Sequence, residues 1–244
     1  MKSYKDIGIP FKQINFGETD RIVSILTKYH GRIDAIAKGV RKLTSRKGGN
    51  IDIMTLSKYS FAKGENLDIV TEVEQIHGYE VVKEDLNTTL SLFFLCELLD
   101  VFLQKGSEER EIFSLLLNIL NLLEQSKTSL AVYAFALKLL TIQGFAPNVS
   151  ECLVCKEPFL EDAKRYVYKI QAGLVCSKHA SGIDKPVSNK ALKVLRFITT
   201  CEIGQSRQVN ISDKLEKELR MIFETWIESA TDRESKSTKY MKNI

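Results

Sequence analysis

The residues best suited to chemistry are three cysteines and a histidine that share one short window. Cys152 and Cys155 form a CxxC pair, and Cys176 and His179 form a CxxH pair after twenty intervening residues. Two residues between ligands allow a tight turn to aim both side chains at one ion, and a hairpin between the pairs can complete a tetrahedron. The spacing therefore predicts one structural Zn2+ ion per chain, because four protein ligands leave no coordination position open for catalysis.

The other two cysteines, Cys96 and Cys201, lie in apolar patterns of helical period. Residues 1–6 show no apolar signal core behind their lysines, so we expect a cytoplasmic protein whose thiols stay reduced. In that setting crowded cysteines favour metal binding over disulfide formation. The alternative is a pair of reduced cysteines, with the other two candidate ligands nearby by chance.

A strongly basic segment is the second feature that suggests a binding role. Residues 38–47 hold five basic residues and no acidic one, and two glycines follow directly. Such a segment is typical of an exposed loop whose cations contact phosphates without reading sequence. The alternative is an ordinary solvated run of charge. The candidate phosphate contacts are Lys38, Arg41, Lys42, Arg46 and Lys47, with Arg21 and Arg32 as weaker candidates.

Catalytic constellations are poor in this sequence. Phosphate-binding GxxxxGK[ST], dinucleotide-binding GxGxxG and nucleophilic GxSxG patterns are all missing. His30 falls at a predicted turn and His77 at a predicted domain junction, while Glu18 and Asp20 read as turn residues. We therefore expect a protein that is not an enzyme.

The elements that position the basic segment have the period of strands. Five runs, 7–14, 20–27, 31–38, 55–62 and 66–76, fall within the first 80 residues without a helical pattern between them. This favours a small barrel of the OB type, a five-stranded fold that binds nucleic acids. Five aromatic residues of the region could stack on bases, although core packing is the commoner role: Phe11, Phe16, Tyr29, Tyr59 and Phe61.

From about residue 81 the apolar residues recur at helical spacing. The predicted helices are 86–104, 108–125, 128–144, 188–200 and 212–230. The sequence thus predicts an α+β protein with an OB domain over 1–80 and an all-α domain over 81–244, which carries a zinc-binding insertion at 150–182. With 44% hydrophobic and 27% charged residues, the chain is neither mainly disordered nor membrane-spanning.

Several motifs, in this order along the chain, resemble the RecO family of recombination mediators. They are Gly17-Glu-Thr-Asp-Arg-Ile-Val23, Thr27-Lys-Tyr-His-Gly-Arg-Ile33, Ala37-Lys-Gly-Val-Arg-Lys42 with Gly48-Gly49, Leu139-Leu-Thr-Ile-Gln-Gly-Phe-Ala-Pro147 before the CxxC pair, and Ser235-Lys-Ser-Thr-Lys-Tyr240. The resemblance implies binding of single- and double-stranded DNA and annealing of complementary strands, in the bacterial cytoplasm at the nucleoid. It also implies two partners, RecR and the acidic carboxy-terminal tail of single-strand-binding protein, and it implies help in loading RecA.

The resemblance implies that the tail of single-strand-binding protein is acidic and ends in an apolar residue. Such a tail requires a binding site with an apolar groove and a basic rim. The basic stretch 185–196 suits this, and Lys190, Lys193 and Arg196 are its candidate contacts. Two other function classes stay open: a zinc-ribbon factor associated with RNA or transcription, and a scaffold that binds only proteins.

Overall fold

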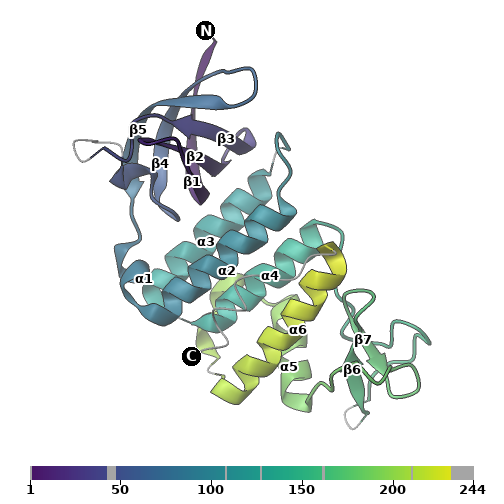
Figure 1. Ribbon diagram of the computed structural model, residues 1–244. Helices are drawn as coiled ribbons and strands as arrows, with labels where there is room; N and C mark the ends of the chain where they lie inside the picture. Colours follow the sequence, from purple (N-terminus) through teal and green to yellow (C-terminus); the bar gives the residue numbers. More distant parts are fainter. Residues whose placement is uncertain are drawn as a thin grey trace. The chain divides into compact units, whose positions relative to one another are not determined.

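A computed structural model describes residues 2–42, 48–107, 109–126, 128–160, 163–209 and 211–231 (Figure 1). The chain divides into two compact units, Met1–Glu124 and Gln125–Ile244. The predicted change from strand to helix occurs where expected, since the last strand of the barrel ends at His77 and the first helix begins at Glu80. The first unit continues beyond this point and includes the first helices together with the barrel.

The first unit begins with a closed five-stranded barrel. Its strands are β1 (Ser3–Phe16), β2 (Asp20–Thr27), β3 (Gly31–Ala37), β4 (Leu56–Ala62) and β5 (Asp68–His77). They follow one another in the order β1-β2-β3-β5-β4, and β1 closes the ring by pairing with β4. Every pair is antiparallel except β3 with β5. This confirms the predicted OB-type barrel.

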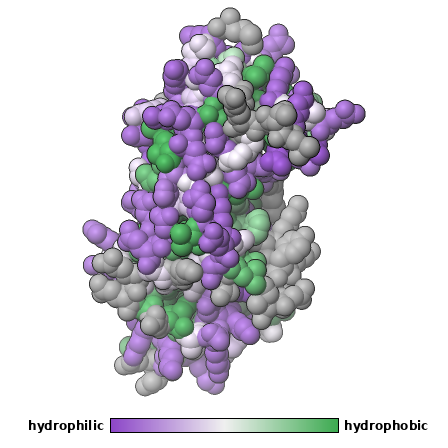
Figure 2. Space-filling model, turned by 90° about the vertical axis from the view of Figure 1, so that its left-hand side faces the viewer, coloured by the Kyte–Doolittle hydropathy of each residue, from purple (hydrophilic) through white to green (hydrophobic). Residues whose placement is uncertain are grey.

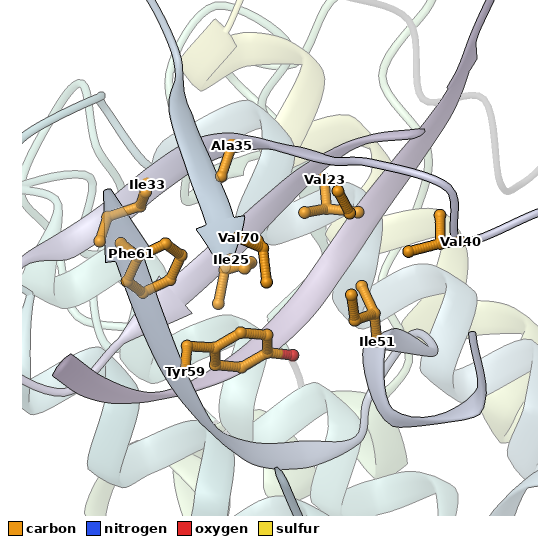
Figure 3. Packing of buried hydrophobic residues seen from close by; sticks show 10 residues of the cluster. Val23, Ile25, Ile33, Ala35, Val40, Ile51, Tyr59, Phe61 and Val70 are labelled. Atoms are coloured by element: carbon orange, nitrogen blue, oxygen red, sulfur yellow. The ribbon is translucent and has the colours of Figure 1, made fainter. Parts of the chain in front are cut away.

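The interior of the barrel is filled by alternate residues of the strands, as the two-residue period of a strand requires. Figure 3 shows these side chains converging from several strands. The cluster comprises Val23, Ile25, Ile33, Ala35, Ala37, Val40, Ile51, Tyr59, Phe61 and Val70, all nearly or fully buried. Tyr59 and Phe61 therefore pack in the core, whereas Phe16 and Tyr29 are 50% and 46% exposed.

Three helices follow the barrel, and the third extends past Glu124, where the first unit ends. They are α1 (Glu80–Glu84), α2 (Leu86–Phe102) and α3 (Arg110–Ser126). Asp85 caps α2, because its carboxylate accepts a hydrogen bond of 3.0 Å from the backbone N–H of Thr88. A short 3₁₀ turn, η1 (Gly49–Ile51), lies between β3 and β4.

Helix α2 lies against the outer face of the barrel. Ser24 and Leu26 alternate with core residues of β2, and Ile9 pairs with Leu26, so all three side chains point outward from the barrel. All three are nevertheless buried. Helix α2 contacts β1, and its Asp100 binds Lys12 and Arg32, which pair with Ser24 and Leu26, so α2 covers this part of the face. Phe11 is buried on the same side, with the guanidinium of Arg32 over its ring at 5.3 Å.

The second unit is mainly helical and contains the cysteine window. Its elements are α4 (Ser129–Ile142), β6 (Arg165–Val167), β7 (Leu174–Cys176), α5 (Asn189–Thr200), the 3₁₀ helix η2 (Ile203–Gln208) and α6 (Asp213–Thr231). Helix α4 is apolar all round and almost wholly buried, as expected for a helix at the centre of a packed group. It contacts α5, α6 and η2.

Among the described residues, no helix combines the length and the apolar character needed to cross a bilayer. On the face of the molecule shown in Figure 2, hydrophilic side chains predominate and hydrophobic ones occur in small scattered groups.

Candidate nucleic-acid interface and metal centre

The basic segment begins directly after β3 and is fastened to the neighbouring β1–β2 hairpin. The carboxylate of Asp20 accepts a 2.8 Å hydrogen bond from the backbone N–H of Gly39. The backbone N–H of Arg41 donates to the carbonyl of Thr19 at 3.0 Å, and its guanidinium donates to the carbonyl of Gly17 at 3.2 Å. These bonds hold the exposed cations of Lys38, Arg41 and Lys42 beside the hairpin tip.

Both ends of this connection use glycine in the left-handed region of backbone space. Gly17 has φ +58° and Gly39 has φ +67°, conformations that strain residues with a Cβ atom. The Gly-Glu-Thr-Asp run is thus a clamp for the basic segment, and not merely a turn between two strands.

The clamp depends on the charge of Asp20. The hydrogen bond from Gly39 N–H lowers the pKa of this carboxyl below its ordinary value of 3.8, with further lowering by the Thr19 hydroxyl and by the charges of Lys38 and Lys42. A carboxyl whose pKa is lowered on folding stabilises the fold fully above its unfolded pKa. That contribution is lost as pH falls through the lowered value, so the clamp holds at neutral pH and releases only in strong acid.

Asp20→Ala is expected to weaken binding of an oligonucleotide about 3- to 10-fold, although it removes a negative charge near the proposed phosphate contacts. We expect the entropy cost of ordering the released segment on DNA to exceed the electrostatic gain from removing the charge of Asp20. Glu18→Ala is the control, because Glu18 is an exposed acid of the same tip and its removal should strengthen binding slightly. Anisotropy titrations at one salt concentration measure both. Tighter binding by Asp20→Ala would show that the clamp has no role.

The other candidate phosphate contacts have different surroundings. Arg46 and Lys47 lie outside the described residues. Arg21 is half-buried in β2, and its guanidinium donates to the side-chain oxygen of Gln13 at 2.9 Å.

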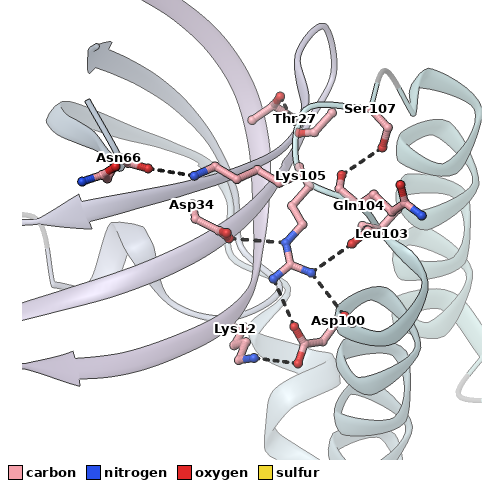
Figure 4. Close-up of polar contacts among 11 residues, drawn as sticks. Lys12, Thr27, Asp34, Asn66, Asp100, Leu103, Gln104, Lys105 and Ser107 are labelled. Atoms are coloured by element: carbon pink, nitrogen blue, oxygen red, sulfur yellow. Dashed lines mark hydrogen bonds and ion pairs between the residues drawn. The ribbon is translucent and has the colours of Figure 1, made fainter. Parts of the chain in front are cut away.

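Arg32 is engaged with α2 and the segment that follows it. Its guanidinium donates to the carbonyls of Asp100 and Leu103 at 3.2 and 3.0 Å, and to a carboxylate oxygen of Asp100 at 3.2 Å. The other carboxylate oxygen of Asp100 accepts from Lys12 at 2.7 Å. Figure 4 shows Asp34, Asp100 and Leu103 gathered around this point. With only 14% of its side chain exposed, Arg32 fastens the barrel to α2.

Arg32→Ala is expected to lower the free energy of unfolding by about 2–4 kcal/mol, since it removes the donor to the carbonyls of Asp100 and Leu103 and one of the two cations that bind the Asp100 carboxylate. Arg21→Ala, which removes a cation from the same barrel, should cost less than about 0.5 kcal/mol. Urea denaturation followed by circular dichroism measures both. Unchanged stability of Arg32→Ala together with weaker oligonucleotide binding would instead identify Arg32 as a phosphate contact.

The structure brings the four candidate metal ligands of the second unit together. Their ligand atoms all lie within 4.8 Å of one another. The Nδ1 atom of His179 lies 3.3 Å from Cys176 Sγ and 3.7 Å from Cys152 Sγ, and the sulfurs of Cys155 and Cys176 are 4.0 Å apart. Metal–sulfur bonds of about 2.3 Å and metal–nitrogen bonds of about 2.0 Å give tetrahedral ligand separations of about 3.5–3.8 Å. The four residues therefore fit one tetrahedral metal ion.

The surroundings of Cys152 favour the thiolate that a metal requires. Burial opposes ionisation of this thiol, but hydrogen bonds from the backbone N–H groups of Cys155, Cys176 and Val154 outweigh it and lower the pKa of Cys152 to about 6. The N–H of Cys176 lies 3.4 Å from the sulfur. Backbone donors of this kind are usual around metal-bound thiolates.

The two halves of the cluster are joined by the predicted hairpin, now seen as β6 and β7. The backbone N–H of Leu153 donates to the carbonyl of Leu174 at 3.0 Å. This bond ties the turn at residues 152–155 to β7; we call this turn and the turn at residues 176–179 the two knuckles of the cluster. The indole N–H of the buried Trp226 in α6 donates to the carbonyl of Gly173 at 3.0 Å. Trp226 therefore fixes the hairpin to the helices, a role with no local signal in the sequence because the two residues are 53 positions apart.

The candidate contacts for an acidic tail share one face of α5. Lys190, Lys193 and Arg196 recur every third residue and are exposed. The guanidinium of Arg196 donates to the carbonyl of Phe159 at 3.3 Å, so the stripe adjoins the cysteine-containing segment.

Comparisons with known proteins cover almost the whole chain. The family model described as Recombination protein O N terminal matches residues 1–79, and the one described as Recombination protein O C terminal matches residues 83–239. Curated relatives described as DNA repair protein RecO include one from Desulforamulus reducens, 27% identical over 100% of this chain and 96% of its own length. Those from Roseiflexus sp. and Thermodesulfovibrio yellowstonii are 29% and 30% identical, over 99% and 92% of this chain and 86% and 92% of their lengths.

Proposed function

Because the chain belongs to the RecO family of DNA repair proteins, we propose that it binds single- and double-stranded DNA and anneals complementary strands. The observation that carries this proposal is the clamped basic segment on an OB-type barrel. Lys38, Arg41 and Lys42 are exposed there, and the hydrogen bonds that the backbone N–H groups of Gly39 and Arg41 donate to Asp20 and Thr19 limit the freedom of the backbone. The adjoining Arg46 and Lys47 belong to the same proposed surface by sequence.

Annealing on such a surface requires no covalent step, and we assign no catalytic residue. Two DNA strands repel through their phosphates, so cations that neutralise both strands lower the barrier to their encounter. Contacts to the backbone leave the base edges available for pairing. In this proposal Arg32 holds the barrel to α2, and Arg21 is a secondary phosphate contact.

The family also suggests a setting for this activity. We propose that the protein works with RecR to load RecA, in the bacterial cytoplasm at the nucleoid, on DNA coated by single-strand-binding protein. The exposed stripe of Lys190, Lys193 and Arg196 would receive the acidic tail of that protein. Charge reversal of the three residues should abolish binding of a tail peptide, and unchanged binding would exclude this site.

The metal that suits the cluster best is Zn2+. Three thiolates and one imidazole at tetrahedral spacing are typical zinc ligands, and the set leaves no position for substrate. Zinc bound there would act as a cross-link that holds the two knuckles together, and Cys152, Cys155, Cys176 and His179 would hold it.

A single annealing assay separates this proposal from the other function classes. Complementary oligonucleotides are mixed with the full-length protein, with and without single-strand-binding protein, and duplex formation is followed by fluorescence. Faster annealing in both conditions supports the proposal. A zinc-ribbon factor would bind RNA or a particular duplex sequence without accelerating annealing, and a protein scaffold would show no salt-sensitive affinity for DNA. Either result would overturn the proposal.

A further inference from the structure

An apolar row crosses the outer face of the barrel beyond the part that α2 covers. The strand register aligns four isoleucines: Ile14 pairs with Ile22, Ile22 with Ile36, and Ile36 with Ile69. These residues alternate with core residues, so their side chains point away from the interior. Ile14 is 51% exposed, and the other three are half-buried.

The row stands in contrast to the middle of the same face. Ser24 and Leu26 also point outward from β2, but they are only 5% and 0% exposed. The face formed by β2 and β3 is where barrels of this type usually bind oligonucleotides. Here α2 occupies its middle, fastened there by the bonds of Lys12 and Arg32 to Asp100. Among the described residues, the outer surface of these strands that remains exposed lies at the β1–β2 hairpin end.

The exposed end of this face adjoins the clamped cations. Phe16 is 50% exposed and lies two residues beyond Ile14 on the same side of β1. The next residue is Gly17, whose carbonyl accepts the hydrogen bond from the Arg41 guanidinium. An apolar surface with a ring and a bordering row of cations complements a nucleic-acid strand that presents unpaired bases and phosphates together.

We propose that Phe16 and Ile14, continued by Ile22, form a platform for unpaired bases of a DNA strand whose phosphates lie on Lys38, Arg41 and Lys42. The platform rests on the proposed DNA-binding function and adds discrimination between single and double strands. Bases in a duplex are stacked within the helix, so only a single strand can use the apolar surface. The open area is short because α2 covers the rest of the face, and it accepts a short run of nucleotides.

The test compares three probes of equal length: oligo(dT), an abasic sugar–phosphate strand, and a duplex. Phe16→Ala, alone and with Ile14→Ala, should weaken oligo(dT) binding about 5- to 10-fold and leave the affinity for the other two probes unchanged. The slope of affinity against salt should also stay unchanged, because no cation is removed. Tyr29→Ala is the matched control, since Tyr29 is a similarly exposed aromatic residue in the turn that follows the opposite end of β2.

A second variant keeps the test independent of folding defects. Phe16→Trp retains an aromatic surface and adds a fluorophore to a chain whose single natural tryptophan is buried. Its emission should be quenched by oligo(dT) and not by the abasic strand, with the wild-type protein as background. Equal effects of Phe16→Ala on all three probes would overturn the platform. The absence of quenching in Phe16→Trp would overturn it too, and that result is expected if the isoleucine row binds a protein instead.

Failure of the platform is distinguishable from failure of the proposed function. Alanine at Lys38, Arg41 and Lys42 should weaken binding of all three probes and reduce the salt slope. If the wild-type protein binds none of the probes, the proposed function itself fails. If the cation variant behaves as expected and Phe16→Ala behaves like wild type, only the base platform is wrong.

Discussion

Replacing Cys152 and Cys155 together by serine is expected to abolish metal binding and to unfold the cysteine-containing segment of the second unit. Loss of two of four ligands leaves a site that cannot enclose an ion, and structural zinc contributes about 10–16 kcal/mol in isolated zinc-finger peptides. The wild-type protein, purified under reducing conditions without added metal, should contain one zinc per chain by elemental analysis, and the variant none. Thermal unfolding should show an early transition that chelation of the wild-type protein reproduces.

Cys96→Ala and Cys201→Ala are matched controls for this result. Both thiols are buried outside the cluster, so their removal should leave the metal content at one ion per chain. Freshly purified, reduced wild-type protein without metal would contradict the assignment. So would a double-serine variant that retains a full equivalent of zinc.

Alanine at Arg41, Lys42, Arg46 and Lys47 together is expected to remove most of the salt dependence of single-strand binding. If three to five phosphates are neutralised, log affinity falls with log salt at a slope of roughly −2 to −3.5. Each lost phosphate contact reduces that slope by about 0.7, so the variant should flatten it by about 2 units or more. Anisotropy titrations at several salt concentrations give the slope.

The basic stripe of α5 supplies a matched control with its own ligand. Alanine at Lys190, Lys193 and Arg196 removes three exposed cations from the second unit. This variant should keep the wild-type salt slope for DNA and lose binding of an acidic tail peptide. A variant of Arg41, Lys42, Arg46 and Lys47 that is folded by circular dichroism and yet keeps the wild-type slope would exclude these four residues as the main phosphate contacts.

Features with strong local signals were predictable from the sequence. The strand runs of the barrel alternate with a period of two, and the observed ends of β2 coincide with the predicted ones. The CxxC and CxxH pairs place their ligands by short knuckles, so the hairpin between them followed from spacing alone. Glycine and polar residues mark the ends of each of these segments, so the local sequence was enough to predict them.

Arg32 shows why other features could not be predicted. Its partner Asp100 is 68 positions away, and nothing in the strand around Arg32 indicates which outward-facing cation a helix will cover. Asp20 is a second case, because its bond to Gly39 links two turns that are separated by two strands. Both interactions depend on how elements pack, and composition and periodicity do not carry that information.

The closure of the barrel between its first and fourth strands has consequences for the order of folding. Residues from Ser3 to Gly8 pair with residues Ser57 to Ala62, and β5 lies between β3 and β4 in the ring, so the ring cannot close on a ribosome until both β4 and β5 have emerged. Contacts of such large sequence separation slow folding, because a long loop must close before they form. Shortening β1 from its amino end would leave β4 with an unpaired edge, and such edges pair readily with other chains. A truncation intended to trim this protein should therefore leave β1 intact.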